Sequence, residues 1–207
     1  GQGFFVRVSP GTSSVTLPFT NAARVTTQAA QPVFQRGAET RPLVRLTLRA
    51  TGSGPHDDVY VYFEPGATAG VDARFDALKL QHNAGLPTLY ALTAGTELSI
   101  NGLPQLSQRT VVPLGIEVPA AGSYTLEAAQ LLNLTTATVY LHDAATGQLI
   151  DLHQQPSYRF TAAAGALAGR FELQFEPQRP TASTTGLPAA QVQLFPNPAH
   201  NQFTVWV

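Results

Sequence analysis

The chain has 207 residues, 43% hydrophobic and 12% charged, with a formal net charge of -1 at pH 7. That charge provides no long-range field to steer nucleic acid or an anionic membrane surface, so neither is expected as a partner. The absence of cysteine excludes disulfides and thiolate metal sites, and no apolar stretch reaches the ~20 residues that span a bilayer.

The first predicted element starts almost at residue 1. In GQGFFVRV, Phe4, Val6 and Val8 alternate with Phe5 and Arg7, the period of a half-buried strand. Natural chains rarely start inside a core strand. We therefore expect residue 1 to lie within a longer protein, with any export signal upstream of it.

Similar alternating segments recur along the chain. They are RPLVRLTLRA, DDVYVYFE, GSYTLEA, ATVYLHD and GRFELQFE. Each has the pattern of a strand with one face on a core and one toward water. The side chains predicted to face inward include Val44, Leu46, Leu48, Val59, Val61, Phe63, Phe171, Leu173 and Phe175.

Turn-forming segments separate these strands. TGSGPHDD, EPGATAG, HNAGLP, VPAAGS and AATGQ are rich in Gly, Pro, Asn and Asp. A spacing of roughly 8 to 15 residues between strands predicts an all-β fold, an antiparallel β-sandwich of jelly-roll or Ig-like type. Residues 72–80, DARFDALKL, are the best helical candidate, at one or two turns. We interpret TAAAGALAG, residues 161–169, as a loop because of its two glycines.

The chain is expected to have three parts. Residues 1–176 form the β-sandwich domain. Residues 177–190, PQRPTASTTGLPAA, combine three prolines with Thr, Ser and Gly and predict an extended linker. Residues 191–207 read as a short pair of terminal strands that turn at Pro-Asn-Pro.

The terminal segment VQLFPNPAHNQFTV resembles the start of the C-terminal sorting domain carried by cargo of the type IX secretion system in Bacteroidetes. Such domains run several tens of residues further, so residues 191–207 would be a truncated beginning. The resemblance implies an exported protein, at the cell surface or extracellular, with the secretion machinery as a partner. The residues that match the pattern are Leu194, Phe195, Pro196, Asn197, Pro198 and Phe203.

Residues 1–175 more loosely resemble the β-sandwich segment that often precedes such sorting domains in large surface proteins. The matching stretches are GQGFFV, FTNAARV, DDVYVYFEPGATAGVDARFDALKL and VYLHDAATGQLIDLHQQPSYRFTAAAGALAGRFELQF. This resemblance implies a location within an exported protein and a β-sandwich architecture, but it implies no catalytic activity. It favours a non-catalytic structural or adhesive domain, with neighbouring copies as possible partners.

Catalytic motifs are not apparent. No Gly-x-Ser-x-Gly occurs, and Ser99 and Ser107 lack a turn that would expose a nucleophile. The five histidines show no His-x-x-x-His spacing, so solvated surface histidine is the better reading than a zinc site. The acids at 57, 58, 64, 72 and 76 look like turn residues rather than a glycosidase pair. We therefore expect no enzyme activity and no obligatory cofactor.

One acidic cluster supports a metal hypothesis. Glu64, Asp72 and Asp76, with carbonyls of the Gly-rich turn between them, offer the oxygen ligands that calcium prefers. The alternative is structural, because Asp commonly caps a short helix or stabilises a turn.

Tyrosines give a second binding hypothesis. Tyr60, Tyr62, Tyr90 and Tyr140 would form a sugar-stacking platform if they lay together on an exposed face, and they are core residues if other segments cover them. The runner-up function is accordingly a carbohydrate-binding module attached to an upstream enzyme, with a surface polysaccharide as its ligand.

Overall fold

The computed structural model describes residues 16, 18, 38–50, 54–80 and 85–178. The chain divides into two units, residues 1–38 and 39–207, and the fold below belongs to the second. The strand predicted at the N-terminus, most of the linker and the terminal strand pair with its Leu194–Phe203 motif lie outside the described residues, so these remain predictions.

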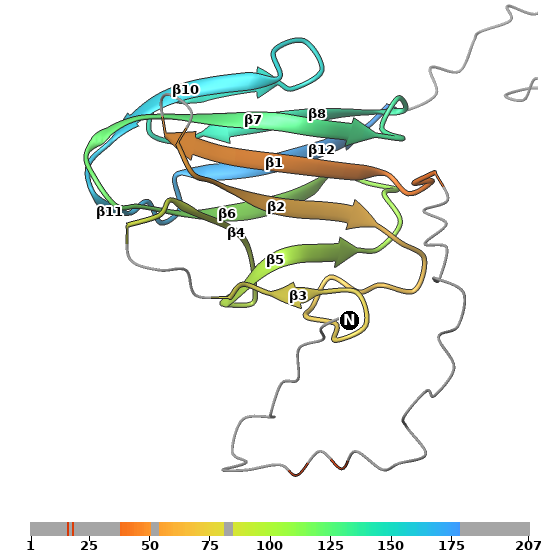
Figure 1. Cartoon of the computed structure of the whole chain (residues 1–207). Coiled ribbons are helices and arrows are strands. Elements are labelled where there is room, and N and C mark those ends of the chain that lie inside the picture. The colour runs from red at the N-terminus through yellow and green to blue at the C-terminus, as the bar shows by residue number, and fades with distance from the viewer. Residues whose placement is uncertain (1–15, 17, 19–37, 51–53, 81–84, 179–207) are drawn as a thin grey trace, which may run out of the picture. The chain divides into compact units, whose positions relative to one another are not determined.

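The described part of the second unit is built from strands (Figure 1). The bounds are β1 Leu43–Ala50, β2 His56–Phe63, β3 Ala77–Leu78, β4 Thr88–Thr93, β5 Thr96–Leu103, β6 Thr110–Val118, β7 Gly122–Leu132, β8 Ala137–Asp143, β9 Gln148–Asp151, β10 Ser157–Ala162, β11 Gly165–Ala166 and β12 Phe171–Pro177. The all-β prediction is confirmed.

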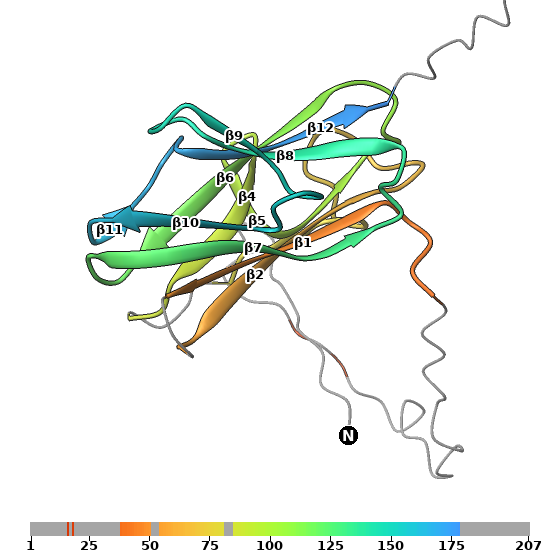
Figure 2. The same ribbon diagram turned by 90° about the horizontal axis from the view of Figure 1, so that it is seen from above.

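The strands form one hydrogen-bonded sheet in the order β10-β7-β1-β2-β5-β4-β6-β12-β8-β9, with β11 beside β6 and β3 beside β5. The sheet curls on itself, so that β8 and β12 cover β7 and β1 in a barrel-like sandwich (Figure 2). A register shift between Arg45 and Leu46, where β1 pairs with β7, marks a bulge. Bulges increase local twist and bend a sheet, which favours this closure.

One described pairing departs from the antiparallel prediction, because β2 and β5 run parallel. β5 is the second arm of a tight hairpin with β4, whose turn residues Ala94 and Gly95 have φ of 48° and 77°. This arm lies between β4 and β2 and runs in the direction of β2. The hairpin itself is local, but its neighbour on the other side is set by tertiary packing.

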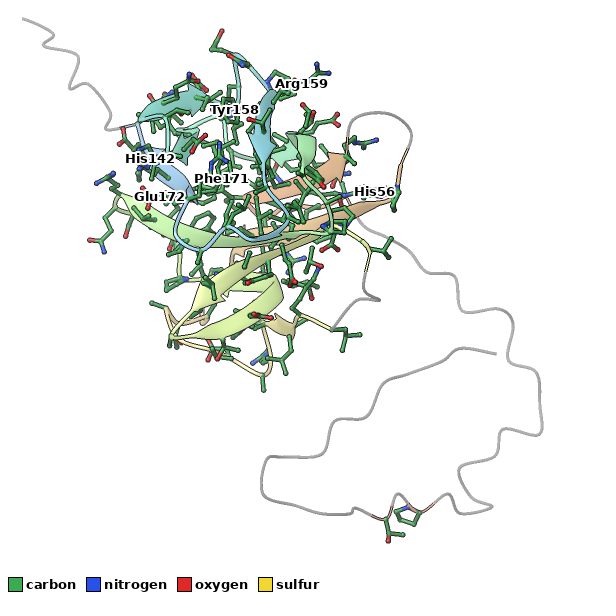
Figure 3. The ribbon with its side chains drawn as sticks, turned by 90° about the vertical axis from the view of Figure 1, so that its left-hand side faces the viewer. His56, His142, Tyr158, Arg159, Phe171 and Glu172 are labelled. Atoms are coloured by element: carbon green, nitrogen blue, oxygen red, sulfur yellow. The ribbon has the colours of Figure 1, made fainter. Side chains whose placement is uncertain are left out.

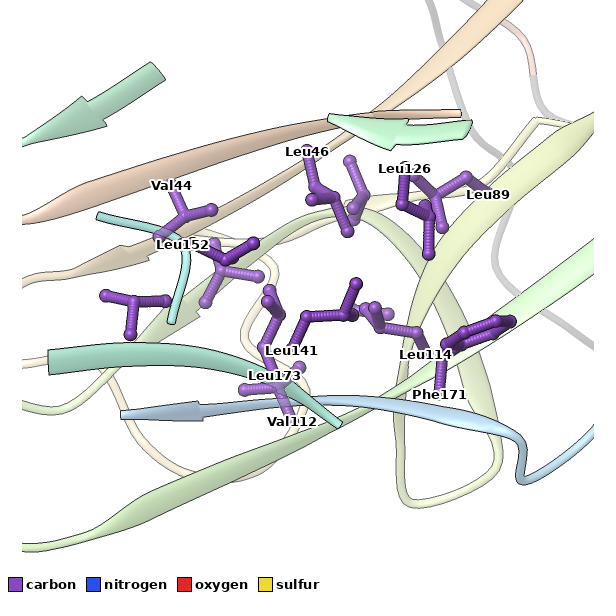
Figure 4. Close-up of a cluster of buried hydrophobic side chains, with 14 of the residues drawn as sticks. Val44, Leu46, Leu89, Val112, Leu114, Leu126, Leu141, Leu152, Phe171 and Leu173 are labelled. Carbon is purple, nitrogen blue, oxygen red and sulfur yellow. The ribbon is translucent and has the colours of Figure 1, made fainter. Parts of the chain in front are cut away.

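The core lies between the two halves of the curled sheet (Figure 4). The Phe63 ring of β2 meets the Phe175 ring of β12 edge-on, with centroids 5.0 Å apart. The alternation predicted from the sequence is confirmed, because every side chain expected to face inward is at most 2% exposed. These are Val44, Leu46, Leu48, Val59, Val61, Phe63, Phe171, Leu173 and Phe175.

The short helix expected at residues 72–80 is wrong. The amide of Asp76 donates one helical hydrogen bond to the Asp72 carbonyl at 2.8 Å, and the chain then enters β3. The amide of Gly102, on β5, donates to Asp76 Oδ1 at 2.7 Å. This contact with a strand distant in sequence ties the segment to the sheet, so the single hydrogen-bonded turn does not continue as a helix.

The reading of Asp57 and Asp58 as turn residues is also wrong, because both lie inside β2. Asp57 is on the inward face at 8% exposure, whereas Asp58 faces outward and bonds Arg45. Two adjacent carboxylates are rare in a strand because one of them must face the core. A partner for Asp57 is therefore required, and Lys79 is one.

Candidate functional site: a tyrosine and arginine groove

A groove of about 420 Å³ lies on the outer face of the sheet, over β1, β2, β3 and β5. The odd-numbered residues of β2 from 59 to 63 are buried, so Tyr60 and Tyr62 project outward into this groove. Ile100, on the neighbouring β5, lines the groove and is 37% exposed. The structure therefore brings two of the four predicted tyrosines to one site.

Guanidinium groups lie over both tyrosine rings. Arg41 Cζ is 4.4 Å from the centroid of the Tyr62 ring, and Arg45 Cζ is 5.7 Å from that of Tyr60. Such contacts are favourable because the ring face is electronegative. Tyr62 is 7% exposed and its hydroxyl donates to the Phe75 carbonyl at 2.8 Å, and burial raises its pKa. Tyr62 therefore builds the groove floor, whereas Tyr60 is half-buried and accessible.

The two arginines whose guanidinium groups lie over the tyrosine rings are both paired with a carboxylate. Arg41 forms a two-pronged hydrogen bond with Glu39, both bonds 2.7 Å long, which lowers the pKa of that carboxyl to about 2. Arg45 is 2.7 Å from Asp58.

Arg74 differs from both. It is exposed at the rim of the groove and has no ion-pair partner among the residues that the structure describes. Its contact is with the neighbouring Phe75 ring, 5.3 Å from guanidinium to centroid. An accessible tyrosine beside an uncompensated guanidinium suits a ligand with both a flat apolar face and a negative charge.

The other two predicted tyrosines lie elsewhere. Tyr90, on β4, packs its ring against Gly115 of β6, where an added Cβ would come within 2.0 Å of the ring. Tyr140 is on β8, paired with Gln174 of β12. The four residues therefore do not form one platform. Sequence periodicity placed Tyr60 and Tyr62 on the face opposite the apolar residues of their strand, but it does not reveal which strands become neighbours.

The predicted calcium ligands are engaged by backbone amides. Asp72 Oδ2 accepts from Thr68 N at 2.7 Å, and Asp76 Oδ2 accepts from Asp72 N at 2.5 Å. These bonds are those of the structural alternative, in which the carboxylates stabilise a turn. Glu64 lies apart, 3.7 Å from Arg41 Nε. Within the described ranges, no three His, Asp or Glu side chains gather in a group that would hold a metal ion.

A larger hollow, about 620 Å³, lies beside the groove and shares Arg41 with it. Phe63, Glu64 and Asn133 also line it. The Asn133 side chain donates to the carbonyls of Glu39 and Arg41, at 2.8 and 3.0 Å, and so holds the segment that leads into β1. Neither hollow was predicted, because both depend on loops that meet only in the folded chain.

A buried polar cluster joins the two ends of the curled sheet. Asp143, at the end of β8, has 0% exposure and accepts hydrogen bonds from Arg170 Nε and Nη2, each 2.9 Å, and from the Tyr158 hydroxyl of β10, also 2.9 Å. Burial alone would raise the pKa of Asp143, but the bonds from Arg170, Tyr158 and the Ala145 amide outweigh it and lower that pKa. The cluster is structural, and the sequence reading missed it.

The described histidines do not form a nucleophilic arrangement. His142 Nδ1 is 3.1 Å from Glu172 Oε1, a cross-strand pair on β8 and β12, and His56 lies well away from it (Figure 3). His153 Nδ1 is 3.6 Å from Asp151 Oδ1. The part of the chain that the structure describes contains no helix that could span a membrane.

Comparison with known proteins adds one relative. The chain is 27% identical over 135 residues to the minor fimbrium subunit Mfa5 of Porphyromonas gingivalis. The aligned region covers 64% of this chain but 11% of that protein, so this chain spans only a small part of its relative's length. No solved structure matches.

The family comparison is more extensive. One family model matches residues 1–175, which include all but the last strand residues of the described sheet. The match also spans residues 1–37, where the sequence predicts the first strand. The chain therefore belongs to the family described as a domain of unknown function (DUF8693).

Proposed function

We propose that this chain is a non-catalytic structural or adhesive domain of a cell-surface protein of fimbrial type. The observation that carries the proposal is the similarity to a minor fimbrium subunit over 135 residues. An all-strand fold with a continuous sheet supports it, because interstrand hydrogen bonds and a packed apolar core resist unfolding outside the cell. Assembly with neighbouring copies belongs to the same proposal.

Surface location is tested on intact cells of the source strain. Antibody raised against residues 39–178 should label intact cells, and protease added outside should remove the labelling without releasing a cytoplasmic marker. Antibody binding that appears only after lysis would contradict a surface role.

We further propose export by the type IX secretion system, on the resemblance of residues 191–207 to the start of a sorting domain. The test fuses a reporter to the native C-terminus, or to a version with residues 194–198 replaced by Gly-Ser, in a Bacteroidetes host that possesses the system. Only the native fusion should reach the surface. Equal surface display of both fusions would contradict this route and leave the surface role standing.

The second candidate function is carbohydrate binding, favoured by the groove. Accessible Tyr60 stacks on a sugar face, and Arg74, which has no ion-pair partner among the described residues, recognises a carboxylate, so the ligand class is an acidic polysaccharide. Calorimetric titration with uronic-acid and matched neutral oligosaccharides tests it. Binding of the acidic series alone, lost in Tyr60→Ala and Arg74→Ala, supports the proposal. Absence of binding in both series rejects it.

A further inference from the structure

The chain has a single lysine, and the structure buries its side chain. Lys79 follows β3 directly, and its side chain is 4% exposed. Its ammonium is in direct contact with the carboxylate of Asp57, whose side chain is 9% exposed. Lysine is rarely buried, and a buried ion pair contributes little net stability because both charges lose water. A contribution to stability therefore does not by itself account for the burial of this pair.

We propose that Lys79 and Asp57 condense to an intramolecular amide bond, which cross-links β2 to the segment after β3. A lysine amine and an aspartate carboxylate are the two groups such an amide requires, and the fold holds them in contact from positions 22 residues apart. Because the folded chain already holds the two groups together, the reaction avoids the entropy loss of a bimolecular encounter.

The geometry around the carboxylate suits the reaction. The Leu89 amide, at the start of β4, donates to Asp57 Oδ2 at 2.7 Å. In the condensation, the neutral amine nitrogen attacks Cγ of Asp57 and negative charge develops on a carboxyl oxygen. A fixed backbone donor on that oxygen stabilises the charge as an oxyanion hole does. Oδ2 then remains as the amide oxygen.

The step balances without a co-reactant. The ammonium carries three protons, of which one stays on the amide nitrogen and two leave with Oδ1 as water. The C–N bond forms as the Cγ–Oδ1 bond breaks, and no atom is oxidised or reduced. A pocket of about 300 Å³, which both residues line, gives the released water a path out.

The amide bond would join two segments of the fold covalently. In the sheet, β5 separates β2 from β3, so the amide would bridge two segments that are not hydrogen-bonded neighbours (Figure 1). The cross-link would close residues 57–79 into a covalent ring. This ring includes Tyr60, Tyr62 and Arg74 of the groove, and its closure restricts the unfolded state.

Intact mass spectrometry of the purified, denatured full chain tests the proposal. The mass should be lower than the sequence mass by one water molecule. Because Lys79 is the only lysine, an amine-reactive reagent should then label the denatured chain once, at its N-terminus. Trypsin should fail to cleave after Lys79 and should release residues 50–74 joined to residues 75–109. An unmodified mass, two labelled amines and cleavage after Lys79 would overturn the proposal.

Variants assign the bond to this pair. Asp57→Ala and Lys79→Arg should each restore the full sequence mass. The matched control is Asp58→Ala, which removes the neighbouring carboxylate that bonds Arg45 and should keep the loss of water. A loss of water that persists in Asp57→Ala would reject this assignment. Since mass is measured on denatured chains, a variant that folds poorly still gives a result, and the parent chain alone can disprove the bond.

Discussion

The guanidinium of Arg170 donates two hydrogen bonds of 2.9 Å each to the carboxylate of Asp143, and its Cζ lies 5.0 and 4.8 Å from the ring centroids of Phe160 and Phe171. These residues come from opposite ends of the sheet, because β10 begins its strand order and β8 and β12 stand near its other end. The contact therefore holds together the two ends of the strand order where the curled sheet closes.

Removal of the Arg170 guanidinium should be strongly destabilising. Arg170→Met leaves the fully buried Asp143 carboxylate without its charged partner, at a cost of about 3 kcal/mol in the free energy of unfolding. Urea unfolding measures it. The matched control is Arg159→Met on the exposed side of β10, with an expected change within about 0.5 kcal/mol. Equal losses in the two variants would show that Arg170 has no special role.

The same carboxylate should set part of the acid stability. The pKa of Asp143 is lowered in the fold from 3.8, so its contribution is present above that pH and is lost as the pH falls through the lower folded value. Asp143→Asn should be less stable at neutral pH, and its stability should fall less steeply below pH 3.8 than that of the parent chain. Urea unfolding across this range checks it. Parallel acid limbs in the two proteins would contradict the assignment.

Glycine at position 115 should be required by the Tyr90 ring. Gly115→Ala places a Cβ 2.0 Å from the ring, and the overpacking should cost about 1 to 3 kcal/mol in the free energy of unfolding. In a Tyr90→Ala background the same change should cost well under 1 kcal/mol, since the clash is gone. Gly122→Ala is the control, with its nearest contact at 3.9 Å. An unchanged cost in the Tyr90→Ala background would refute the steric explanation.

The predicted calcium site gives a simple thermal test. Calcium that binds Asp72, Asp76 and Glu64 in the folded state should raise the melting temperature relative to excess chelator. Asp72→Asn should abolish that difference. The same melting temperature in calcium and in chelator leaves only the structural role, in which the two aspartates hold the turn through the Thr68 and Asp72 amides.

Much of the β-structure was predictable because it is encoded locally. Alternating side chains in RPLVRLTLRA and GRFELQFE predicted both strands and their buried faces, since successive residues of a strand point to opposite sides. The same local reading misjudged residues 72–80. There the propensity for a helical turn is outweighed by a contact between Asp76 and Gly102, 26 residues away, which local sequence does not reveal.

The sequence by itself determined which apolar side chains face inward along β1, β2 and β12. It also supplied an outward Tyr60 and Tyr62, because this property depends on a period of two within one segment. Only the tertiary structure decided which strands are neighbours, and this choice places Arg74 and Tyr60 in one groove, whereas Tyr90 and Tyr140 lie outside it. It likewise joined Lys79 to Asp57 across β5. The physical reason is that strand order minimises exposed apolar area over the whole chain, so it cannot be read from any one segment.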